Sequence, residues 1–439
     1  MEITKIETNL RKNLFLKEYK NIHPKEYKES VEFNVINIYE DIYYQEFIGF
    51  GGAFTDSSGY SFSLLNNEKQ DSFINDYFNN NYSLGRIPIA SSDFSTHSYS
   101  YSEKEDLSDF NIEEDKKYII PLIKKALEKN PHLKFLASPW SPPKFMKSNN
   151  TRLLGGKLKK EFYKTYAKYL VKFIKAYKKE HINIDYITIQ NEPNATQVWE
   201  SCLFNAEEEY DFLLNYLYPE FKKEKIKTKI LIWDHNKEKL YTRAKKELTT
   251  KTENIIDGIA YHYYTGDHFE NINILKEKYP NKLLIHTEGC TAFSKFKKDN
   301  LLKSAEIYAH DIIGDLNHGA NAYIDWNLIL DHKGGPNHKF NYCDSPIMLN
   351  KKHDDFIKNL SYYYISHFSK FIKPGAHRIA FSKFTDQIEM TAFKNKDKSL
   401  IIVLFNKNDF NKEYNLVLND KVLHDNLDKH AIVTYVIKL

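Results

Sequence analysis

The stretch that decides the fold is DYITIQNEP, residues 185–193. Its aromatic and β-branched residues favour a β-strand, and Pro193 ends it because proline cannot donate to a strand ladder. We therefore predict a short buried strand with an amide and an acid, Asn191 and Glu192, at its C-terminal end. Barrels of alternating parallel strands and helices carry their chemistry at that end. The alternative interpretation is a loop glutamate that caps a helix.

A second stretch of the same kind favours the barrel interpretation. KLLIHTEG, residues 282–289, is an apolar strand that ends in Glu288 and is followed by the permissive Gly289. Two strands that deliver one glutamate each to the same end of a barrel suggest the carboxylate pair of a glycosidase. One carboxylic acid then protonates the leaving oxygen, and the other carboxylate acts at the anomeric carbon.

The chain on either side of these stretches alternates between strand and helix patterns. Together they predict a parallel (β/α)8 TIM barrel over residues 46–372, within an α/β fold class. Strands are predicted at 48–56, 84–89, 133–138, 185–193, 229–233, 256–262, 282–287 and 320–326. Helices are predicted near 68–79, 115–129, 159–179, 206–221, 237–248, 270–278, 301–317 and 355–371.

The two ends of the chain have a different pattern. Residues 31–38 alternate between apolar and polar side chains, as a half-buried antiparallel strand does. Short strands separated by turn residues are predicted at 377–383, 387–393, 399–405, 413–418 and 431–437. We expect residues 373–439 to form a small β-sandwich domain, which strands within residues 1–45 complete.

Composition and charge exclude several classes of partner. The net charge is only +4, which argues against a nucleic acid or another polyanion. No apolar run reaches 18 residues, so we predict no transmembrane segment. The first residues lack the pattern of a secretory signal, and the expected location is cytoplasmic, or secreted if a leader was trimmed. Nothing in the sequence indicates an oligomeric state.

The predicted strand ends carry acids, amides, a histidine and aromatic rings. This set suits a neutral polyhydroxylated ligand, which is bound by carboxylates and by stacking on flat rings. It predicts no metal and no cofactor, because no histidine pair has the spacing of zinc ligands and the three cysteines are widely separated. The residues are Asp93, Trp140, Asn191, Glu192, His262, Tyr263, Tyr264, Glu288, Asp325 and Trp326.

Eight ordered motifs resemble glycoside hydrolase family 30, and within it the glucosylceramidase (acid β-glucosidase, glucocerebrosidase) branch. They are GFGGAFTD (49–56), ASSDFS (90–95), ASPWSPP (137–143), NEP (191–193), TEGC (287–290), DWNL (325–328), GGPN (334–337) and HFSKFI (367–372). The family resemblance implies a (β/α)8 barrel with a side β-domain and retaining β-glycosidase activity. The loop QVWESC (197–202) resembles bacterial members of the family.

The resemblance also implies residue roles. Glu192 matches the acid/base and Glu288 the nucleophile, so we expect Glu192 to be protonated and Glu288 ionised at the pH optimum. The sugar-binding positions implied by the matching motifs are Asp93, Phe94, Trp140, Asn191, His262, Tyr263, Tyr264, Trp326 and Asn341. Tyr263 replaces a tryptophan and Tyr342 a phenylalanine of the glucosylceramidase pattern, so aglycone contacts differ.

Several alternatives remain open at this stage. The substrate is a small-molecule or lipid-linked β-glycoside, and terminal β-glucosides are the leading expectation. A β-xylosidase, a β-fucosidase or an endo-1,6-β-glucanase shares the same barrel and glutamate pair, and a non-catalytic carbohydrate-binding protein is the rival from another class. His262 either bonds a carboxylate or contacts the sugar, Trp199 is either an aglycone platform or loop packing, and Arg86 is expected to pair with a barrel carboxylate.

Overall fold

The structure is a computed structural model that describes residues 1–28, 32–79, 81–291 and 301–438. By their contacts these residues separate into two compact units. One unit consists of the described residues within 51–294 and 323–357 and contains most of a barrel of strands. The other consists of the described residues within 1–50, 295–322 and 358–439. Each unit is described by itself below.

Eight parallel strands close into a barrel, as the sequence predicts. The strand order around the barrel is β10-β11-β12-β5-β6-β7-β8-β9, so each strand pairs with its neighbours in sequence. The strands are β5 (Gly49–Ala53), β6 (Leu84–Ile89), β7 (Lys134–Pro139), β8 (Tyr186–Thr188), β9 (Lys229–Asn236), β10 (Ile256–His262), β11 (Leu283–Glu288) and β12 (Ala322–Asn327).

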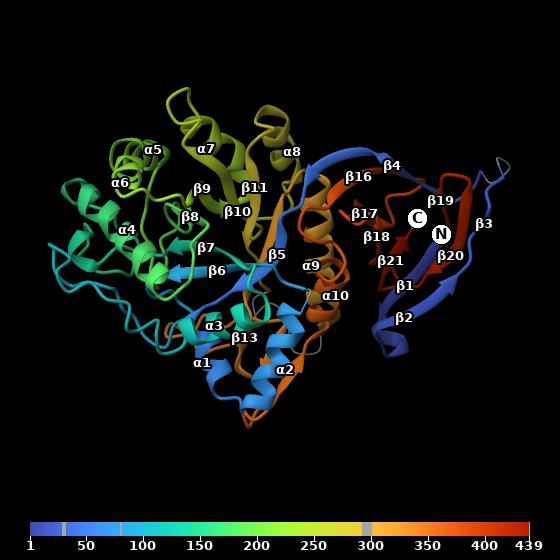
Figure 1. Ribbon diagram of the computed structural model, residues 1–439, viewed down its shortest axis with the longest axis horizontal. Coiled ribbons are helices and arrows are strands. Elements are labelled where there is room, and N and C mark those ends of the chain that lie inside the picture. Colours follow the sequence, from blue (N-terminus) through green and yellow to red (C-terminus); the bar gives the residue numbers. More distant parts are fainter. Residues whose placement is uncertain (29–31, 80, 292–300, 439) are drawn as a thin grey trace. The chain divides into compact units, whose positions relative to one another are not determined.

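Helices α4–α8 lie outside the strands of the barrel in Figure 1. The helices of this unit are α1 (Asp56–Ser63), α2 (Asn67–Phe78), α3 (Ile119–Lys129), α4 (Tyr163–Lys179), α5 (Ala206–Phe212), α6 (Tyr218–Lys223), α7 (Leu240–Glu247) and α8 (Phe269–Lys278). The short strands β13 (Ile329–Leu330), β14 (Ile347–Leu349) and β15 (Phe356–Lys358) form a separate small sheet.

Local sequence explains these elements. In α4 the stripe of Tyr166, Leu170, Phe173 and Tyr177, at steps of three and four residues, is fully buried, as its spacing predicts. In β5 the glycines permit close packing, because a Cβ at Gly51 would lie 2.3 Å from a backbone oxygen of the neighbouring strand. The stripe shows which face of α4 is buried, and the glycine lets β5 lie close to β6.

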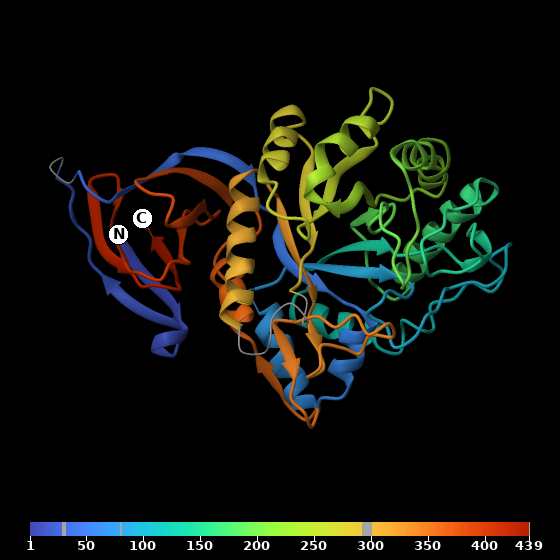
Figure 2. The ribbon, with the colours of Figure 1, turned by 180° about the vertical axis from the view of Figure 1, so that it is seen from behind.

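The second unit is built around one ten-stranded sheet with the order β2-β1-β21-β18-β17-β16-β4-β19-β20-β3. Strands from both ends of the chain contribute to it, and Figure 2 shows the first and last strands side by side. This confirms the prediction that both termini build one β-domain. The strands are β1 (Glu2–Asn9), β2 (Leu14–Ile22), β3 (Lys25–Glu26), β4 (Val35–Glu46), β16 (His377–Lys383), β17 (Glu389–Lys394), β18 (Leu400–Asn406), β19 (Lys412–Leu418), β20 (Lys421–Leu427) and β21 (Ala431–Lys438).

Buried side chains from most of these strands, at opposite ends of the sheet order, belong to one apolar core. The helices α9 (Leu301–Asn317) and α10 (Leu360–Ser369) pack against each other and against strands of this sheet. The last helix predicted from the sequence corresponds to α10, which begins five residues later than expected because the short strand β15 precedes it. In the described residues no helix is long and apolar enough to span a membrane.

Candidate active site

The backbone of Glu192 has an unusual conformation. Four residues beyond β8, Glu192 has a φ of 47°, in the left-handed region that costs a residue with a Cβ about 1–3 kcal/mol. Its N–H donates to the Asp234 carbonyl oxygen at 3.0 Å, and the N–H of the preceding Asn191 donates to Pro139 at 2.8 Å. The neighbouring strand ends thus hold the carboxylate-bearing turn in place.

Asp234 lies at a β-bulge in a barrel strand. On β9 it is the extra residue, because Trp233 pairs with Ala260 and His235 pairs with Tyr261. Trp233 and Asp234 have positive φ values of 75° and 55°, and such a bulge re-aims a side chain. The Asp234 carboxylate is fully buried and accepts from the hydroxyls of Thr188 and Thr287 at 2.7 and 2.5 Å.

Arg86 connects the carboxylates of the barrel, as the sequence analysis expects. Its guanidinium, fully buried on β6, donates to Glu288 Oε2 at 2.5 Å and to Asp234 Oδ2 at 2.9 Å. It also donates to Asn191 Oδ1 at 2.8 Å. The charge of Arg86 is the main influence that offsets burial and lowers the pKa of Asp234. The strands therefore present Glu288 and Asn191 in fixed orientations.

The two glutamates predicted from the sequence, Glu192 and Glu288, lie close to each other and to His262. One carboxylate oxygen of Glu192, one of Glu288 and one nitrogen of His262 all lie within 4.8 Å of one another. The His262 ring joins Glu192 Oε1, 3.3 Å from Nδ1, to Asp234 Oδ1, 3.1 Å from Nε2. His262 is completely buried, so the structure favours the carboxylate-bonding alternative for this residue.

The charges around His262 decide its protonation. Burial lowers the pKa of His262, but the charge of Glu288 and the hydrogen bonds to Asp234 and Glu192 outweigh it and raise the pKa to about 9. For Glu192, burial raises the pKa, but the His262 bond and nearby positive charge lower it below its usual range. This direction is opposite to the one expected for a simple acid, because the imidazolium stabilises the Glu192 carboxylate.

The same three side chains have a spacing that could surround a metal ion. Both nitrogens of His262, however, lie at hydrogen-bonding distance from carboxylates, and an imidazolium has no lone pair to offer a cation. The donor set is better explained as a group of acids that shares a proton. That no metal is needed stays a prediction.

Two tyrosines lie beside Glu288. Tyr264 donates to Glu288 Oε1 at 2.8 Å, so both oxygens of this carboxylate accept hydrogen bonds, one from Tyr264 and one from Arg86. Tyr263 donates instead to the carbonyl of Cys290 at 2.5 Å, two residues after Glu288. All three cysteines of the chain are buried free thiols.

The remaining predicted sugar-binding residues surround the same end of the barrel. Trp140 and Trp326 are stacked with ring centroids 5.2 Å apart, and Phe94 meets Trp326 edge-on at 5.9 Å. Asp93 accepts from Asn341 at 3.0 Å, and burial raises the pKa of Asp93 to about 7. Trp199 is half-buried and packs against the apolar cluster that contains Trp140 and Trp326.

Asp234 belongs to this site but is not among the residues predicted from the sequence. The predicted strand ended at residue 233, and strand alternation carries no signal for a bulge that turns the next side chain inward. Asn337 was also missed, although its motif was quoted: its amide donates to Asp93 at 3.4 Å and to the Asn341 carbonyl at 3.0 Å. An amide four residues before Asn341 in a glycine- and proline-rich loop was the available signal.

Comparisons with known proteins match both the barrel and the β-domain. The glycosyl hydrolase family 30 TIM-barrel domain matches residues 47–372, and the family's β-sandwich domain matches residues 375–435. The lysosomal acid glucosylceramidase of Mus musculus is 34% identical over 389 residues, which cover 83% of this chain and 75% of that protein.

Two solved structures are similar over nearly the whole chain. SrfJ from Salmonella typhimurium has a TM-score of 0.97 at 33% identity, with 100% of both chains covered. The endo-β-1,6-glucanase BT3312 has a TM-score of 0.89 at 29% identity, with 99% of this chain and 98% of that chain covered. The family match spans the barrel and the site, and the chain therefore belongs to glycosyl hydrolase family 30 and is a glycoside hydrolase.

Proposed function

We propose that the chain is a retaining β-glycosidase of the glucosylceramidase type that hydrolyses terminal β-glucosides. Glu288 acts as the nucleophile and Glu192 as the acid/base. The observation that carries the proposal is the approach of one oxygen from each carboxylate to within 4.8 Å. Retaining enzymes have carboxyl groups about 5–5.5 Å apart, whereas inverting enzymes need about 6.5–9.5 Å to admit a water molecule.

The hydrogen bonds at Glu288 suit a nucleophile. Arg86 and Tyr264 hold the two oxygens of its carboxylate, which fixes the carboxylate plane. An Oε atom of Glu288 attacks the anomeric carbon, the bond to the leaving oxygen breaks, and a covalent glycosyl-enzyme forms. Water then hydrolyses this ester, and the β-configuration is retained.

Glu192 and His262 share the proton that the leaving oxygen needs. With its pKa raised to about 9, His262 is the group that holds this proton near neutral pH, and its two nitrogens lie 3.1 Å from Asp234 and 3.3 Å from Glu192. Movement of this proton onto Glu192 leaves a neutral imidazole, still bonded to Asp234, and creates the carboxylic acid that the leaving oxygen needs. Glu192 afterwards takes a proton from the attacking water.

Asp93 supports a preference for a terminal sugar. It is buried, and the next residue, Phe94, packs in the same cluster as the tryptophan pair, so the Asp93 carboxyl group could bond two hydroxyls of a glucose ring. Asn341 and Asn337 hold it there. A site built to bond a hydroxyl rejects an analogue without it by up to roughly 10⁴–10⁵-fold, so β-xylosides are expected to be poor substrates if the 6-hydroxymethyl group is bonded.

A second candidate is an endo-1,6-β-glucanase, which the similarity to BT3312 favours. The two candidate functions differ in whether the sugar-binding site is closed beyond the terminal sugar. Comparing kcat/KM on aryl β-glucoside, aryl β-xyloside, aryl β-fucoside, fluorescent glucosylceramide and a 1,6-β-glucan separates them. Faster cleavage of xyloside, or cutting in the middle of the glucan, would overturn the proposed preference.

Asp93→Asn provides the matching variant. It keeps the shape of the side chain but can no longer accept two hydroxyl protons, and we expect about a 100-fold loss of kcat/KM on β-glucoside. If Asp93 bonds the 6-hydroxyl, the loss on β-xyloside is smaller and the preference between the sugars narrows. An equal loss on both sugars would assign Asp93 to hydroxyls that the two share. Proton NMR of the wild-type reaction should show the β-hemiacetal first.

A further inference from the structure

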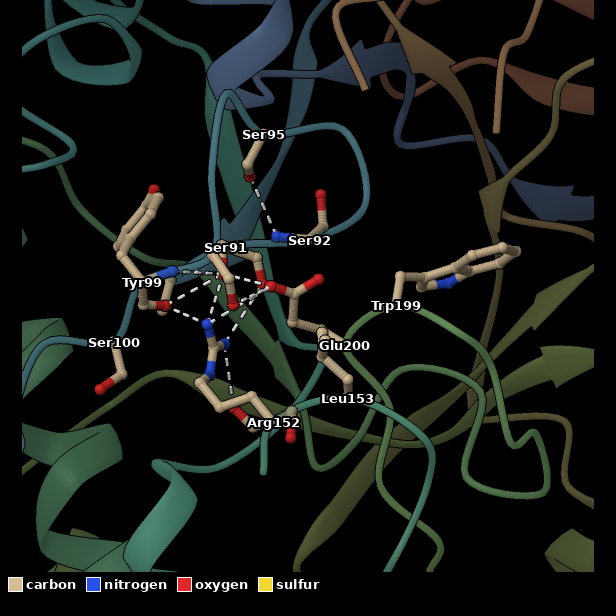
Figure 3. A network of polar contacts seen from close by, with 12 residues as sticks. Ser91, Ser92, Ser95, Tyr99, Ser100, Arg152, Leu153, Trp199 and Glu200 are labelled. Atoms are coloured by element: carbon tan, nitrogen blue, oxygen red, sulfur yellow. Dashed lines mark hydrogen bonds and ion pairs between the residues drawn. The ribbon is translucent and has the colours of Figure 1, made fainter. Parts of the chain in front are cut away.

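Beside the catalytic carboxylates, a second group of buried charges ties together several loops of the barrel's catalytic end (Figure 3). We call it the Glu200 cluster: Glu200 with its partners Ser91, Ser98, Arg152 and His338. These residues come from the loops that follow β6, β7, β8 and β12. The same loops carry Asp93 and Asn341, so the cluster lies next to predicted sugar contacts in the chain.

Glu200 is held as an anion. Its carboxylate accepts from Ser91 at 2.7 Å and from Ser98 at 2.6 Å, and it is ion-paired with Arg152 at 3.8 Å and with His338 at 3.2 Å. Burial raises the pKa of Glu200, but the His338 bond and the Arg152 charge outweigh it and lower the pKa to about 2. No catalytic step proposed above uses this carboxylate.

The backbone on either side of Glu200 is pinned as well. Glu200 forms an antiparallel bridge with Leu153, and the N–H of Ser201 donates to the Arg152 carbonyl at 3.1 Å. Consecutive residues of an extended segment point to opposite sides. Figure 3 accordingly shows Glu200 directed into the network and Trp199 directed away from it.

Trp199 points toward the sugar-binding aromatics. Its half-buried indole packs against the apolar cluster that contains Trp140, Trp326 and Phe94, and the adjacent Val198 is exposed. Part of the ring therefore stays uncovered at the rim of the site. A flat indole stacks well on another flat ring, whether a pyranose or an aryl group, and offers no comparable match to a flexible alkyl chain.

We propose that Glu200 is a positioning residue that fixes Trp199 as a stacking surface for a ring-shaped aglycone. This rests on the proposed function, and it narrows the substrate class to β-glycosides whose leaving group is a second sugar or an aryl ring. Arg152 and the serine hydroxyls hold Glu200, the bridge to Leu153 transmits that position, and Trp199 makes the contact. Specificity for the leaving group is thus set by a buried ion pair.

The test is a double-mutant cycle with Trp199→Ala, Glu200→Gln and the double variant. Each enzyme is assayed on phenyl β-glucoside, octyl β-glucoside and β-glucosyl fluoride, which has no aglycone ring. We expect both single variants to lose about tenfold in kcat/KM on phenyl β-glucoside, mainly through KM, and less than threefold on the other two substrates. The double variant should equal Trp199→Ala, because Glu200 acts through Trp199.

The matched control is Glu389→Gln. Glu389 is a mostly buried glutamate that pairs with His310 at 2.8 Å and Lys407 at 2.5 Å, in the unit without the barrel site. It should lower the melting temperature and leave the substrate ratios unchanged. Additive losses in the double variant, or equal losses on all three substrates, would overturn the proposal.

Failure of the proposed function has a different signature. If wild-type enzyme cleaves none of the three β-glucosides, the sugar assignment is wrong, and the same cycle is run on the corresponding β-xylosides or β-fucosides. The ratio of phenyl glycoside to glycosyl fluoride then still reports on Trp199. A ratio that Trp199→Ala does not change for the accepted sugar would overturn the stacking role by itself.

Discussion

Two groups of buried charges lie at the same end of the barrel and contain the same residue types, but we assign them different roles. The Arg86 cluster, namely Arg86, Glu192, Asp234, His262 and Glu288, lies on the barrel strands and on the turn that follows β8, whereas the Glu200 cluster lies on longer loops. The side chains of Glu192 and Glu288 remain 15% and 10% exposed, whereas that of Glu200 is completely buried. Exposed side-chain surface thus distinguishes acids that could reach a substrate from an acid that holds loops together.

The two clusters also differ in their balance of acidic and basic groups. In the Arg86 cluster three carboxylates face two cations, Arg86 and His262, so the group can share a proton and pass it on. In the Glu200 cluster one carboxylate faces Arg152 and His338 and stays ionised. The following variants test whether this contrast separates catalysis from positioning.

The largest difference between the clusters is expected from two isosteric substitutions. Glu288→Gln removes the proposed nucleophile and should lower kcat roughly 10⁴–10⁶-fold, as removal of a covalent catalyst does. Glu200→Gln should leave kcat within about tenfold, because its effect falls mainly on KM. Initial rates on an aryl β-glucoside give both values. Similar losses of kcat in the two variants would erase the distinction.

A second readout follows the covalent intermediate. A 2-fluoro glucoside with a good leaving group should add one fluoroglucosyl unit to wild-type enzyme, and peptide mass spectrometry should place it on Glu288. Glu200→Gln should be labelled as well, and Glu288→Gln should not. Label on any other carboxylate would assign the nucleophile elsewhere.

Glu192→Ala should lower the rate less than Glu288→Gln does, and the size of the loss should depend on the leaving group. Proton transfer by a positioned acid contributes about 10²–10⁴-fold, and a leaving group that departs without a proton needs little of it. We expect a large loss on methyl β-glucoside, a small loss on 2,4-dinitrophenyl β-glucoside, and recovery of turnover with azide on the latter. Uniform loss without recovery would remove Glu192 from the acid/base role.

The sequence predicts the barrel because its signal is repeated eight times. Apolar strands such as 256–262 and 84–89 are bounded by turn residues, and the structure reproduces both ranges. Helix α1 was missed because DSSGYSFS is poor in helix-forming residues; its start depends on Thr55, which caps Ser58 at 3.0 Å. Strand β20 was missed because KVLHDNL is largely polar.

The candidate site could be predicted only where one residue carries its own signal. Glu192 and Glu288 follow strand patterns and match motifs, whereas Asp234 depends on a bulge and on the partners that Arg86 and His262 provide across the barrel. Glu200 lies in a loop whose sequence reveals no partner, and its cluster exists because four loops converge. Long-range convergence of this kind has no local pattern.

His262→Gln sharpens the account of proton sharing. In wild type the basic limb of kcat/KM should follow loss of the shared proton, and the pKa of His262 is raised to about 9. The variant leaves Glu192 to hold its own proton, so the basic limb should move to lower pH, with about a 10- to 100-fold loss near neutral pH. Movement to higher pH would make His262 only a charge beside Glu192.

The stability of the same variant has its own pH dependence. Because the folded-state pKa of His262 lies above its unfolded value of about 6.5, its contribution to stability is complete below that value and is lost as pH rises through about 9. The difference in unfolding free energy between wild type and His262→Gln should shrink over that interval. Urea unfolding at several pH values measures it, and a constant difference would contradict a protonated His262.

The smallest effect is expected at the rim, where two neighbouring tyrosines differ in what they hold. Tyr263 donates to the carbonyl of Cys290 at 2.5 Å, while Tyr264 donates to the Glu288 carboxylate at 2.8 Å. Tyr263→Phe should lower the unfolding free energy by about 1–2 kcal/mol, through an unpaired carbonyl, and change kcat by less than about threefold.

Tyr264→Phe is the matched control for Tyr263→Phe, since it removes the same atom one residue away. It should lower kcat by about tenfold or more, because a hydrogen bond to a charged group contributes about 1.5–3 kcal/mol and this one orients the proposed nucleophile, Glu288. Steady-state kinetics and urea unfolding of the two variants give the comparison. If Tyr263→Phe proved the more damaging to kcat, then the position of Cys290, and not the bond at Glu288, would be what keeps the nucleophile in line with the anomeric carbon.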